Sequence, residues 1–389
     1  MIAQIALPRI LRLGGGASRE LPGLLNTLGL QRPFIVTDNF LAASGLLEPL
    51  LDGLRQAGIP SRLFSGTVPD PTVASIEAGL ESLRQGEHDC VVGFGGGSPL
   101  DSAKAIAMLA VHGGAMADYK VPHVQDAPGL PVIAIPTTAG TGSEATRVCV
   151  ITDGETDEKM LCAGLAYLPV AALVDYELTL GKPRRLTADT GIDSLTHAIE
   201  AYVSRRANPF SDAMALASMR LIAPNLRRVC ADPADRAARE AMMAGALKGG
   251  IAFSNSSVAL VHGMSRPIGA HFHVPHGLSN AMLLPAVTAW SAPAALPRYA
   301  DCARAMGVAS ESEGDQIAVA RLLEELSSLN HDLDVPGPAA WGIDAARWHG
   351  LIPLMCTQAL ASGSPANNPR IPTEADMADL YESVWHAGS

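Results

Sequence analysis

The stretch Val91-Val92-Gly93-Phe94-Gly95-Gly96-Gly97-Ser98-Pro99-Leu100-Asp101 sets the fold expectation for the first half of the chain. Its apolar start predicts a buried strand, and three consecutive glycines then lead into a helix. We predict Ser98 as the helix N-cap, Pro99 in the first turn and Asp101 as the capping-box partner of Ser98. Glycines let the backbone approach an anion closely, and a helix N-terminus offers unpaired N–H groups, so a pyrophosphate is the expected ligand.

The same stretch matches neither of two common phosphate-binding motifs. Ser98 stands where the last glycine of GxGxxG would be, and no Gly-Lys-Ser/Thr follows as in a P-loop. A tight strand–helix turn without a ligand is therefore the alternative. A second segment, Pro136-Thr137-Thr138-Ala139-Gly140-Thr141-Gly142-Ser143-Glu144, follows another apolar run and carries hydroxyl groups that can bond ribose and diphosphate oxygens. Two such loops favour a bound nucleotide over plain turns.

Asp38 closes an earlier apolar run, Pro33-Phe34-Ile35-Val36-Thr37-Asp38. A carboxylate at such a strand end accepts hydrogen bonds from an adenosine ribose and repels a 2′-phosphate, which favours NAD over NADP. A helix N-cap or turn aspartate is an equally good interpretation of this residue.

Short apolar runs and helical segments alternate around these loops. The expected strands are at 33–38, 62–64, 90–94, 132–135 and 171–175, with helices at about 41–57 and 72–85. This alternation predicts a parallel sheet with helices on both faces. From about residue 186 the composition favours helix, over 189–204, 211–229, 236–254 and 317–329. We expect a Rossmann-like α/β domain over 1–185, an all-helical domain over 186–389, and a ligand crevice between them.

Composition restricts the partners and the compartment. The 389 residues, 48% of them hydrophobic and 17% charged, suffice for two apolar cores. A formal net charge of −11 repels a phosphate backbone, so we expect no nucleic-acid partner. Six cysteines without CxxC spacing indicate buried thiols in a reducing compartment. With no signal-peptide pattern and no apolar run of membrane length, a cytoplasmic protein with no membrane association is expected.

Residues of metal-ligating type gather in the second half. Asp193 and His197 lie four apart in a predicted helix, so both project from one face. Four of the eleven histidines fall within residues 261–277, namely His262, His271, His273 and His276. The pair and the cluster together favour a divalent metal site over isolated structural histidines, although spacing does not decide which of the four take part. A carboxylate with imidazoles suits Fe(II) or Zn(II) and leaves a position for a substrate oxygen.

Taken together, these segments resemble the iron-containing (group III) alcohol dehydrogenases over nearly the whole chain. The similar segments are Gly95–Lys104, Pro136–Glu144, Gly191–Glu200 and Val274–Gly277. The resemblance implies a metal-binding helical domain whose ligands are Asp193, His197, His262 and His276, with Fe(II) expected and Zn(II) as the alternative. It also implies NAD as cofactor and a homodimer. Our expected cofactor-binding residues are Asp38, Gly95, Gly96, Gly97, Ser98, Asp101, Thr137, Thr138, Thr141 and Lys159.

Arg266 is a departure from that family, many of whose members carry a histidine near the nicotinamide, four residues after the equivalent of His262. Arginine does not release its proton at any working pH. Arg266 is therefore interpreted either as a group that orients a substrate bearing a carboxylate or another anion, or as a structural surface arginine. His273 is our candidate for the proton relay, with a structural role as the alternative.

The expected function is metal-assisted hydride transfer between NAD and a small primary alcohol or aldehyde, with an acidic semialdehyde as one option. A bound metal lowers the pKa of the alcohol, and the nicotinamide takes the hydride. One alternative is a sugar-phosphate cyclase of the dehydroquinate synthase type, which would need several Lys and Arg residues for the substrate phosphate. The other is a catalytically silent binding protein, against which the complete ligand set argues.

Overall fold

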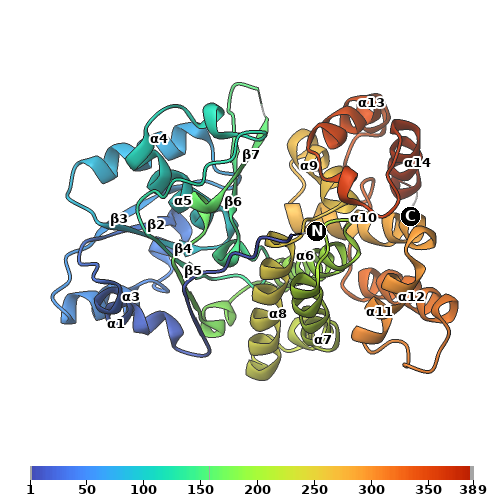
Figure 1. Ribbon diagram of the computed structural model, residues 1–389, viewed down its shortest axis with the longest axis horizontal. Helices are drawn as coiled ribbons and strands as arrows, with labels where there is room; N and C mark the ends of the chain where they lie inside the picture. The colour runs from blue at the N-terminus through green and yellow to red at the C-terminus, as the bar shows by residue number, and fades with distance from the viewer. Residues whose placement is uncertain (1, 157, 386–389) are drawn as a thin grey trace. The chain divides into compact units, whose positions relative to one another are not determined.

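The computed structural model describes residues 2–156 and 158–385. The chain divides into two compact units, drawn in Figure 1. One is Ile5–Gly181, and the other is formed by the described residues from Lys182 onward together with those before Ile5. Within the described residues, no helix combines the length and the apolar character that crossing a membrane requires.

The first unit contains a six-stranded sheet in which every strand pair is parallel. Its strands, in spatial order, are β1 (Ile10–Leu13), β8 (Ala171–Val174), β5 (Val132–Pro136), β4 (Cys90–Gly95), β2 (Pro33–Asp38) and β3 (Arg62–Thr67). The four inner strands are buried along nearly their whole length, as in sheets that are covered on both sides. The predicted parallel sheet is confirmed. Edge strand β1 and the antiparallel pair β6 (Val148–Thr152) and β7 (Lys159–Ala163) were not predicted.

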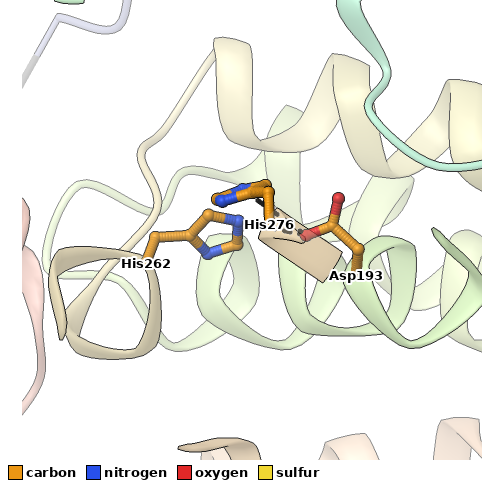
Figure 2. A group of neighbouring side chains, drawn as sticks. All are labelled: Asp193, His262 and His276. Atoms are coloured by element: carbon orange, nitrogen blue, oxygen red, sulfur yellow. Dashed lines mark ion pairs between the residues drawn. The ribbon is translucent and has the colours of Figure 1, made fainter. Parts of the chain in front are cut away.

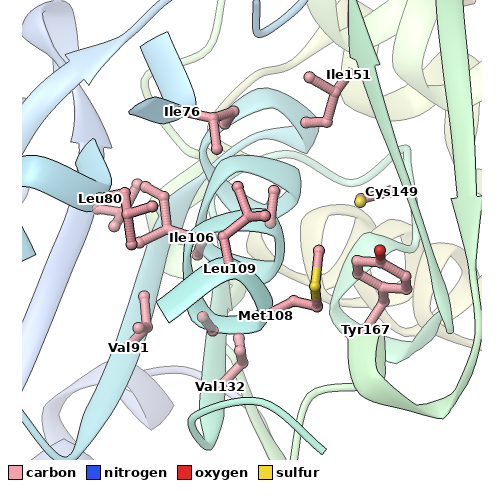
Figure 3. Packing of buried hydrophobic residues seen from close by; sticks show 14 of the residues in the cluster. Ile76, Leu80, Val91, Ile106, Met108, Leu109, Val132, Cys149, Ile151 and Tyr167 are labelled. Atoms are coloured by element: carbon pink, nitrogen blue, oxygen red, sulfur yellow. The ribbon is translucent and has the colours of Figure 1, made fainter. Parts of the chain in front are cut away.

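Helices cover both faces of this sheet. Successive residues of β2 point to opposite sides, so Phe34 and Val36 belong to one apolar cluster and Ile35 to the other. Helices α4 (Val73–Arg84) and α5 (Gly97–His112) complete the first cluster, part of which is shown in Figure 3. Helices α1 (Leu21–Leu28) and α3 (Glu48–Gln56) complete the second.

The single helix predicted over 41–57 is wrong. Two helices occur there, α2 (Asn39–Ala43) and α3. Gly45 separates them with a φ of 78°, a left-handed backbone that does not continue a helix. A proline in the first turn of α3 favours the start of a second, separate helix at that point.

The second unit is helical, and its described part holds no strand. Its helices are α6 (Arg184–Val203), α7 (Pro209–Ala231), α8 (Arg236–Ser254), α9 (Leu260–Phe272), α10 (His276–Ser291), α11 (Leu296–Ala305), α12 (Asp315–Asp332), α13 (Ala345–Ala361) and α14 (Glu374–Trp385). The four predicted helices correspond to α6, α7, α8 and α12. Helix α6 is buried from Thr187 almost continuously to its end and packs against α7, α8 and α10. Gly191 permits the contact with α7, since a Cβ there would lie 2.4 Å from Leu226 Cδ1.

Candidate functional site

The two glycine-bearing loops lie side by side, beyond the carboxyl ends of neighbouring strands β4 and β5. The backbone N–H of Thr137 donates to the carbonyl of Gly95 at 2.9 Å. A Cβ on Gly97 would lie 3.0 Å from Thr141 Cγ2, and a Cβ on Gly95, whose φ is +153°, would lie 2.4 Å from Pro99 Cγ. Gly97 therefore allows the two loops to approach each other, and Gly95 allows the tight turn into α5.

The predicted N-cap at Ser98 is wrong. Helix α5 starts earlier, with Gly96 as its N-cap and without a side-chain capping bond, so Ser98 lies inside the first turn. Asp101 forms no capping box, because its carboxylate accepts hydrogen bonds from Ser143 Oγ at 2.6 Å and from the backbone N–H of Val150 at 2.9 Å. A glycine cap leaves the first N–H groups of the helix uncovered by a side chain, as anion binding requires.

A buried cation that the sequence analysis did not identify holds the second loop in place. Lys104 Nζ donates to Ser143 Oγ and to the carbonyl of Val148, both at 2.8 Å, and to the hydroxyl and carbonyl of Thr146 at 3.1 and 3.2 Å. Burial lowers the pKa of Lys104 and raises the pKa of neighbouring Glu144 to about 7. The only signal for Lys104 in the sequence is its place inside an apolar helix that follows a buried strand.

Two predicted ribose-binding residues have protein partners. Asp38 Oδ1 accepts a hydrogen bond from the backbone N–H of Leu41 at 2.8 Å, so Asp38 caps α2, as the alternative interpretation expected. Lys159 Nζ, at the start of β7, pairs with Asp70 Oδ1 at 3.0 Å. Their contacts with a ribose stay predictions.

In the helical unit, Asp193 from α6, His262 from α9 and His276 from α10 point toward one another (Figure 2). One ligand atom from each lies within 4.8 Å of the other two. Asp193 Oδ1 is 3.5 Å from His262 Nε2 and 3.8 Å from His276 Nε2. Gly277 allows α10 to begin this close to α6, because a Cβ there would lie 2.5 Å from the carbonyl oxygen of Asp189. The arrangement suits a divalent cation.

His197 lies beside this trio. Its Nε2 is 4.0 Å from Asp193 Oδ1, as the four-residue spacing on α6 implies. Its ring stacks between those of His262 and Phe253, with centroids 4.5 and 4.3 Å away. Three predicted ligands thus converge, and the fourth packs against one of them.

A buried carboxylate orients His262. Glu200 Oε2 accepts from His262 Nδ1 at 2.6 Å, and the two carboxylate oxygens also accept the backbone N–H groups of Ala259 at 2.9 Å and Val261 at 2.6 Å. A proton on Nδ1 leaves the Nε2 lone pair facing Asp193. Burial opposes a charge on His262, but Glu200 and Asp193 outweigh it and raise its pKa to about 9. Burial likewise opposes ionisation of Asp193, yet the surrounding histidines hold its pKa far below the ordinary value.

Two further residues at this centre, Glu200 and Asn280, were not predicted from the sequence. Asn280 Nδ2 donates to Asp193 Oδ1 at 2.6 Å. Spacing carries a signal for both, since Glu200 follows His197 by three residues on α6 and Asn280 follows His276 by four on α10.

Arg266 and His273 occupy different settings on α9. Arg266 Nη1 donates to Ser364 Oγ at 3.0 Å, and among the described residues no carboxylate lies within 4.0 Å of its guanidinium. Burial lowers the pKa of Arg266, partly offset by the charge of Glu200. His273 ends the helix with a φ of 55°, and its side chain is exposed. His271, another candidate, bonds Gln358 at 2.8 Å.

Comparison with known proteins gives full-length matches. Residues 8–176 match the family described as iron-containing alcohol dehydrogenase, and residues 187–385 match the C-terminal family of the Fe-containing alcohol dehydrogenases. Long-chain-alcohol dehydrogenase 1 of Geobacillus thermodenitrificans is 38% identical over 388 residues, which are 99% of this chain and 97% of that protein.

Solved structures agree with these sequence matches. A 1,3-propanediol oxidoreductase superposes with a TM-score of 0.94 at 34% identity, covering 99% of this chain and 100% of that one. Sulfoacetaldehyde reductase from Bifidobacterium kashiwanohense, in complex with NAD+, superposes with a TM-score of 0.89 at 28% identity, covering 100% of both chains. The predicted fold and family are confirmed. The chain belongs to the iron-containing alcohol dehydrogenase family and is an NAD-dependent oxidoreductase of the alcohol dehydrogenase and aldehyde reductase type.

Proposed function

We propose that this dehydrogenase interconverts a small primary alcohol and its aldehyde by means of a divalent ion held by Asp193, His197, His262 and His276. The convergence of one carboxylate and two imidazole nitrogens within 4.8 Å of one another carries the proposal. The donors fit such an ion, because Glu200 holds the proton on the far nitrogen of His262. When bound, the ion polarises the substrate oxygen, and NAD accepts or returns the hydride.

We assign NAD binding to the domain of residues 1–185 and metal binding to residues 186–389. The nucleotide fits the paired loops, where Gly96 is the N-cap of α5 and a Cβ on it would come no closer than 3.5 Å to Thr138. Thr137 Oγ1 is buried there without a hydrogen-bond partner among the described residues. We propose that Gly95, Gly96, Gly97 and Ser98 hold the diphosphate, with Asp101, Thr137, Thr138 and Thr141 shaping the neighbouring loop. We assign Asp38 and Lys159 to the riboses.

For the ion we propose Fe(II), with Zn(II) as the alternative, since carboxylate and imidazole ligands suit both. To distinguish the two ions, the metal-depleted enzyme is reconstituted with each one, and the turnover of the two preparations is compared. We also propose a homodimer, for which sedimentation should give twice the 40.4 kDa of one chain.

The decisive experiment replaces the carboxylate of the trio. Asp193→Ala should lose the metal and lower kcat/KM by about 1000-fold or more, because several kcal/mol of metal-assisted stabilisation disappear. The Asp193→Ala variant should still bind NADH, as measured by fluorescence titration. Asp189→Asn is the matched control, one turn earlier on α6 and paired with Arg185 rather than with the trio. Full turnover by Asp193→Ala without bound metal would refute the assignment.

We further infer that the substrate carries an acidic group bound by Arg266. A guanidinium has five N–H donors, and here its only hydrogen-bond partner among the described residues is the Ser364 hydroxyl. Side chains on a helix lean toward its N-terminus, which directs Arg266 toward the turn that carries His262. Sulfoacetaldehyde, which the reductase from B. kashiwanohense is named for, is an aldehyde with a sulfonate.

Paired substrates test this inference. Arg266→Ala should lower kcat/KM for a carboxylate- or sulfonate-bearing aldehyde by about 100-fold, because a buried charge pair is lost. A neutral aldehyde of similar length should be nearly unaffected. Equal losses for both substrates would assign Arg266 a structural role.

We propose His273 as the proton relay, because its side chain is exposed and it precedes His276 by three residues in the sequence. His273→Ala should shift the pH profile of kcat while the metal content stays unchanged. An unchanged pH profile would show that His273 takes no part in proton transfer and has only a structural role at the end of α9.

A further inference from the structure

Asn280 is fully buried on α10, one helical turn after His276. Its side-chain nitrogen Nδ2 is 2.6 Å from Asp193 Oδ1, 3.1 Å from His262 Nε2 and 3.3 Å from His276 Nε2. A single terminal group therefore contacts one atom from each member of the trio. Any ion that contacts these three atoms must also lie against the amide of Asn280.

The other end of that amide has no partner. Asn280 Oδ1 is buried, and no hydrogen bond reaches it from the described residues. A buried acceptor left unpaired costs about 1–3 kcal/mol. Rotation by half a turn about the last side-chain bond exchanges nitrogen and oxygen with little change in shape, so either atom can occupy the position next to the trio.

The charge of a bound ion determines whether Nδ2 or Oδ1 of Asn280 lies next to the trio. A cation repels the N–H groups of an amide and attracts its carbonyl oxygen, and amide oxygens are recognised ligands for divalent cations. We propose that Asn280 presents Oδ1 to the ion held by Asp193, His262 and His276, as a further metal ligand of this centre. The inference rests on the proposed metal site and adds an oxygen donor to it.

An additional neutral oxygen has a chemical consequence. Zn(II) sites are mostly four-coordinate, whereas oxygen donors beside imidazole also suit Fe(II) and Mn(II). An amide oxygen adds a donor without adding charge. The centre thus keeps the single negative charge of Asp193 against a divalent ion.

Two substitutions separate an oxygen ligand from a hydrogen-bond donor. Asn280→Leu has neither group at a similar volume, and Asn280→Asp has oxygen but no N–H. The probes are Co(II) and Zn(II), with affinity measured by chelator competition and coordination by the visible absorption of Co(II). We expect Asn280→Leu to weaken both ions by more than about tenfold and to change the Co(II) bands. Asn280→Asp should bind at least as tightly as the wild type, with wild-type bands.

Two results would overturn the proposal that Asn280 is a metal ligand. If Asn280→Asp weakens both ions and the Co(II) bands of both variants match the wild type, Asn280 only orients Asp193 through its N–H, and the proposal falls. Wild-type affinity in Asn280→Leu would also overturn it. If Asn280→Leu does not fold, the spectrum and affinity of Asn280→Asp decide alone. A wild-type chain that binds neither ion would contradict the proposed metal site itself, which is a different failure.

Asn368 offers a matched control. It is 2% exposed, and its Nδ2 bonds Ser291 Oγ at 2.9 Å and the carbonyl of Arg370 at 2.7 Å, with no contact to the trio. Asn368→Leu should lower the Tm measured in excess chelator and leave the Co(II) affinity and spectrum unchanged.

Discussion

The two units of this dehydrogenase form their candidate sites from different parts of the chain. In the α/β unit the site is mainly main chain, because two loops and the start of α5 meet where glycines leave the backbone uncovered. The charged groups there, Lys104 and Asp101, bond residues of the second loop and of the strand that follows it. In the helical unit the site consists of side-chain atoms from α6, α9 and α10 that meet at one point.

This difference determines how each site can fail. A main-chain site tolerates many side-chain changes but not an added Cβ where a ligand must approach. A side-chain site depends on whatever fixes the orientation of each ligand, as Glu200 does for His262. A lesion in either unit should therefore affect one ligand and spare the other.

The largest effect expected to distinguish the two units concerns the buried carboxyl group of Glu144 in the α/β unit. Burial raises its pKa from 4.5 to about 7. A raised folded-state pKa means that its stabilising contribution is fully present below pH 4.5 and is lost as the pH rises through 7. Between these values the unit should lose roughly 3 kcal/mol. Glu144→Gln should remove this dependence.

Hydrogen exchange measures that effect in the right unit. All four tryptophans (Trp290, Trp341, Trp348 and Trp385) lie in the helical unit, so their fluorescence does not report on β5 or α5. Protection of the β5 and α5 amides should fall from pH 5 to pH 8 in the wild type and stay level in Glu144→Gln. Glu77→Gln, at an exposed position on α4, should behave like the wild type. A level wild-type profile would contradict the prediction.

The next effect concerns the partner of His262 in the helical unit. Glu200→Gln should weaken Zn(II) binding by about 10- to 100-fold, because a neutral amide with one accepting oxygen replaces the carboxylate whose two oxygens accept from His262, Ala259 and Val261. Chelator competition should be run at pH 9.5, above the His262 pKa of about 9, so that altered proton competition does not mask the loss. NADH affinity should not change. Glu325→Gln, which alters a pair with Arg227, is the control. Undiminished Zn(II) affinity in Glu200→Gln would show that His262 needs no such partner.

Much of the α/β site could be predicted because its signals are contiguous in sequence. An apolar run, glycines and a helix start lie within one short stretch, and the alternation of strands and helices predicts the sheet. The errors there come from competition between neighbouring residues. Gly96 takes the cap expected at Ser98, and Gly45 interrupts the helix expected over 41–57.

The helical site was only partly predictable because its members come from separate helices. The four-residue spacing of Asp193 and His197 is local and readable. The choice of His262 and His276 over His271 and His273 needed a family resemblance, since spacing alone does not show how α9 and α10 pack against α6. Helical spacing places Glu200 near His197 and Asn280 near His276, but the ligand that each one contacts across helices follows only from the structure.

The smallest expected effect tests the main-chain character of the nucleotide loops most directly. A Cβ on Gly96 would meet Thr138 only at 3.5 Å, and its φ of −75° suits any residue, so Gly96→Ala should fold normally. The added methyl would nevertheless stand where the diphosphate is expected. We predict about tenfold weaker NADH binding, with wild-type metal content.

Gly95 supplies the contrast that makes this measurement informative. Its φ is +153°, and a Cβ there would collide with Pro99 at 2.4 Å, so Gly95→Ala should lower the Tm as well as NADH affinity. Gly96→Ala should lower affinity alone, as judged by fluorescence titration and thermal unfolding of both variants. If Gly96→Ala binds NADH as tightly as the wild type, the diphosphate does not approach the cap of α5. The glycines would then be needed only for the close packing of the two loops, as at Gly97, where a Cβ would lie 3.0 Å from Thr141 Cγ2.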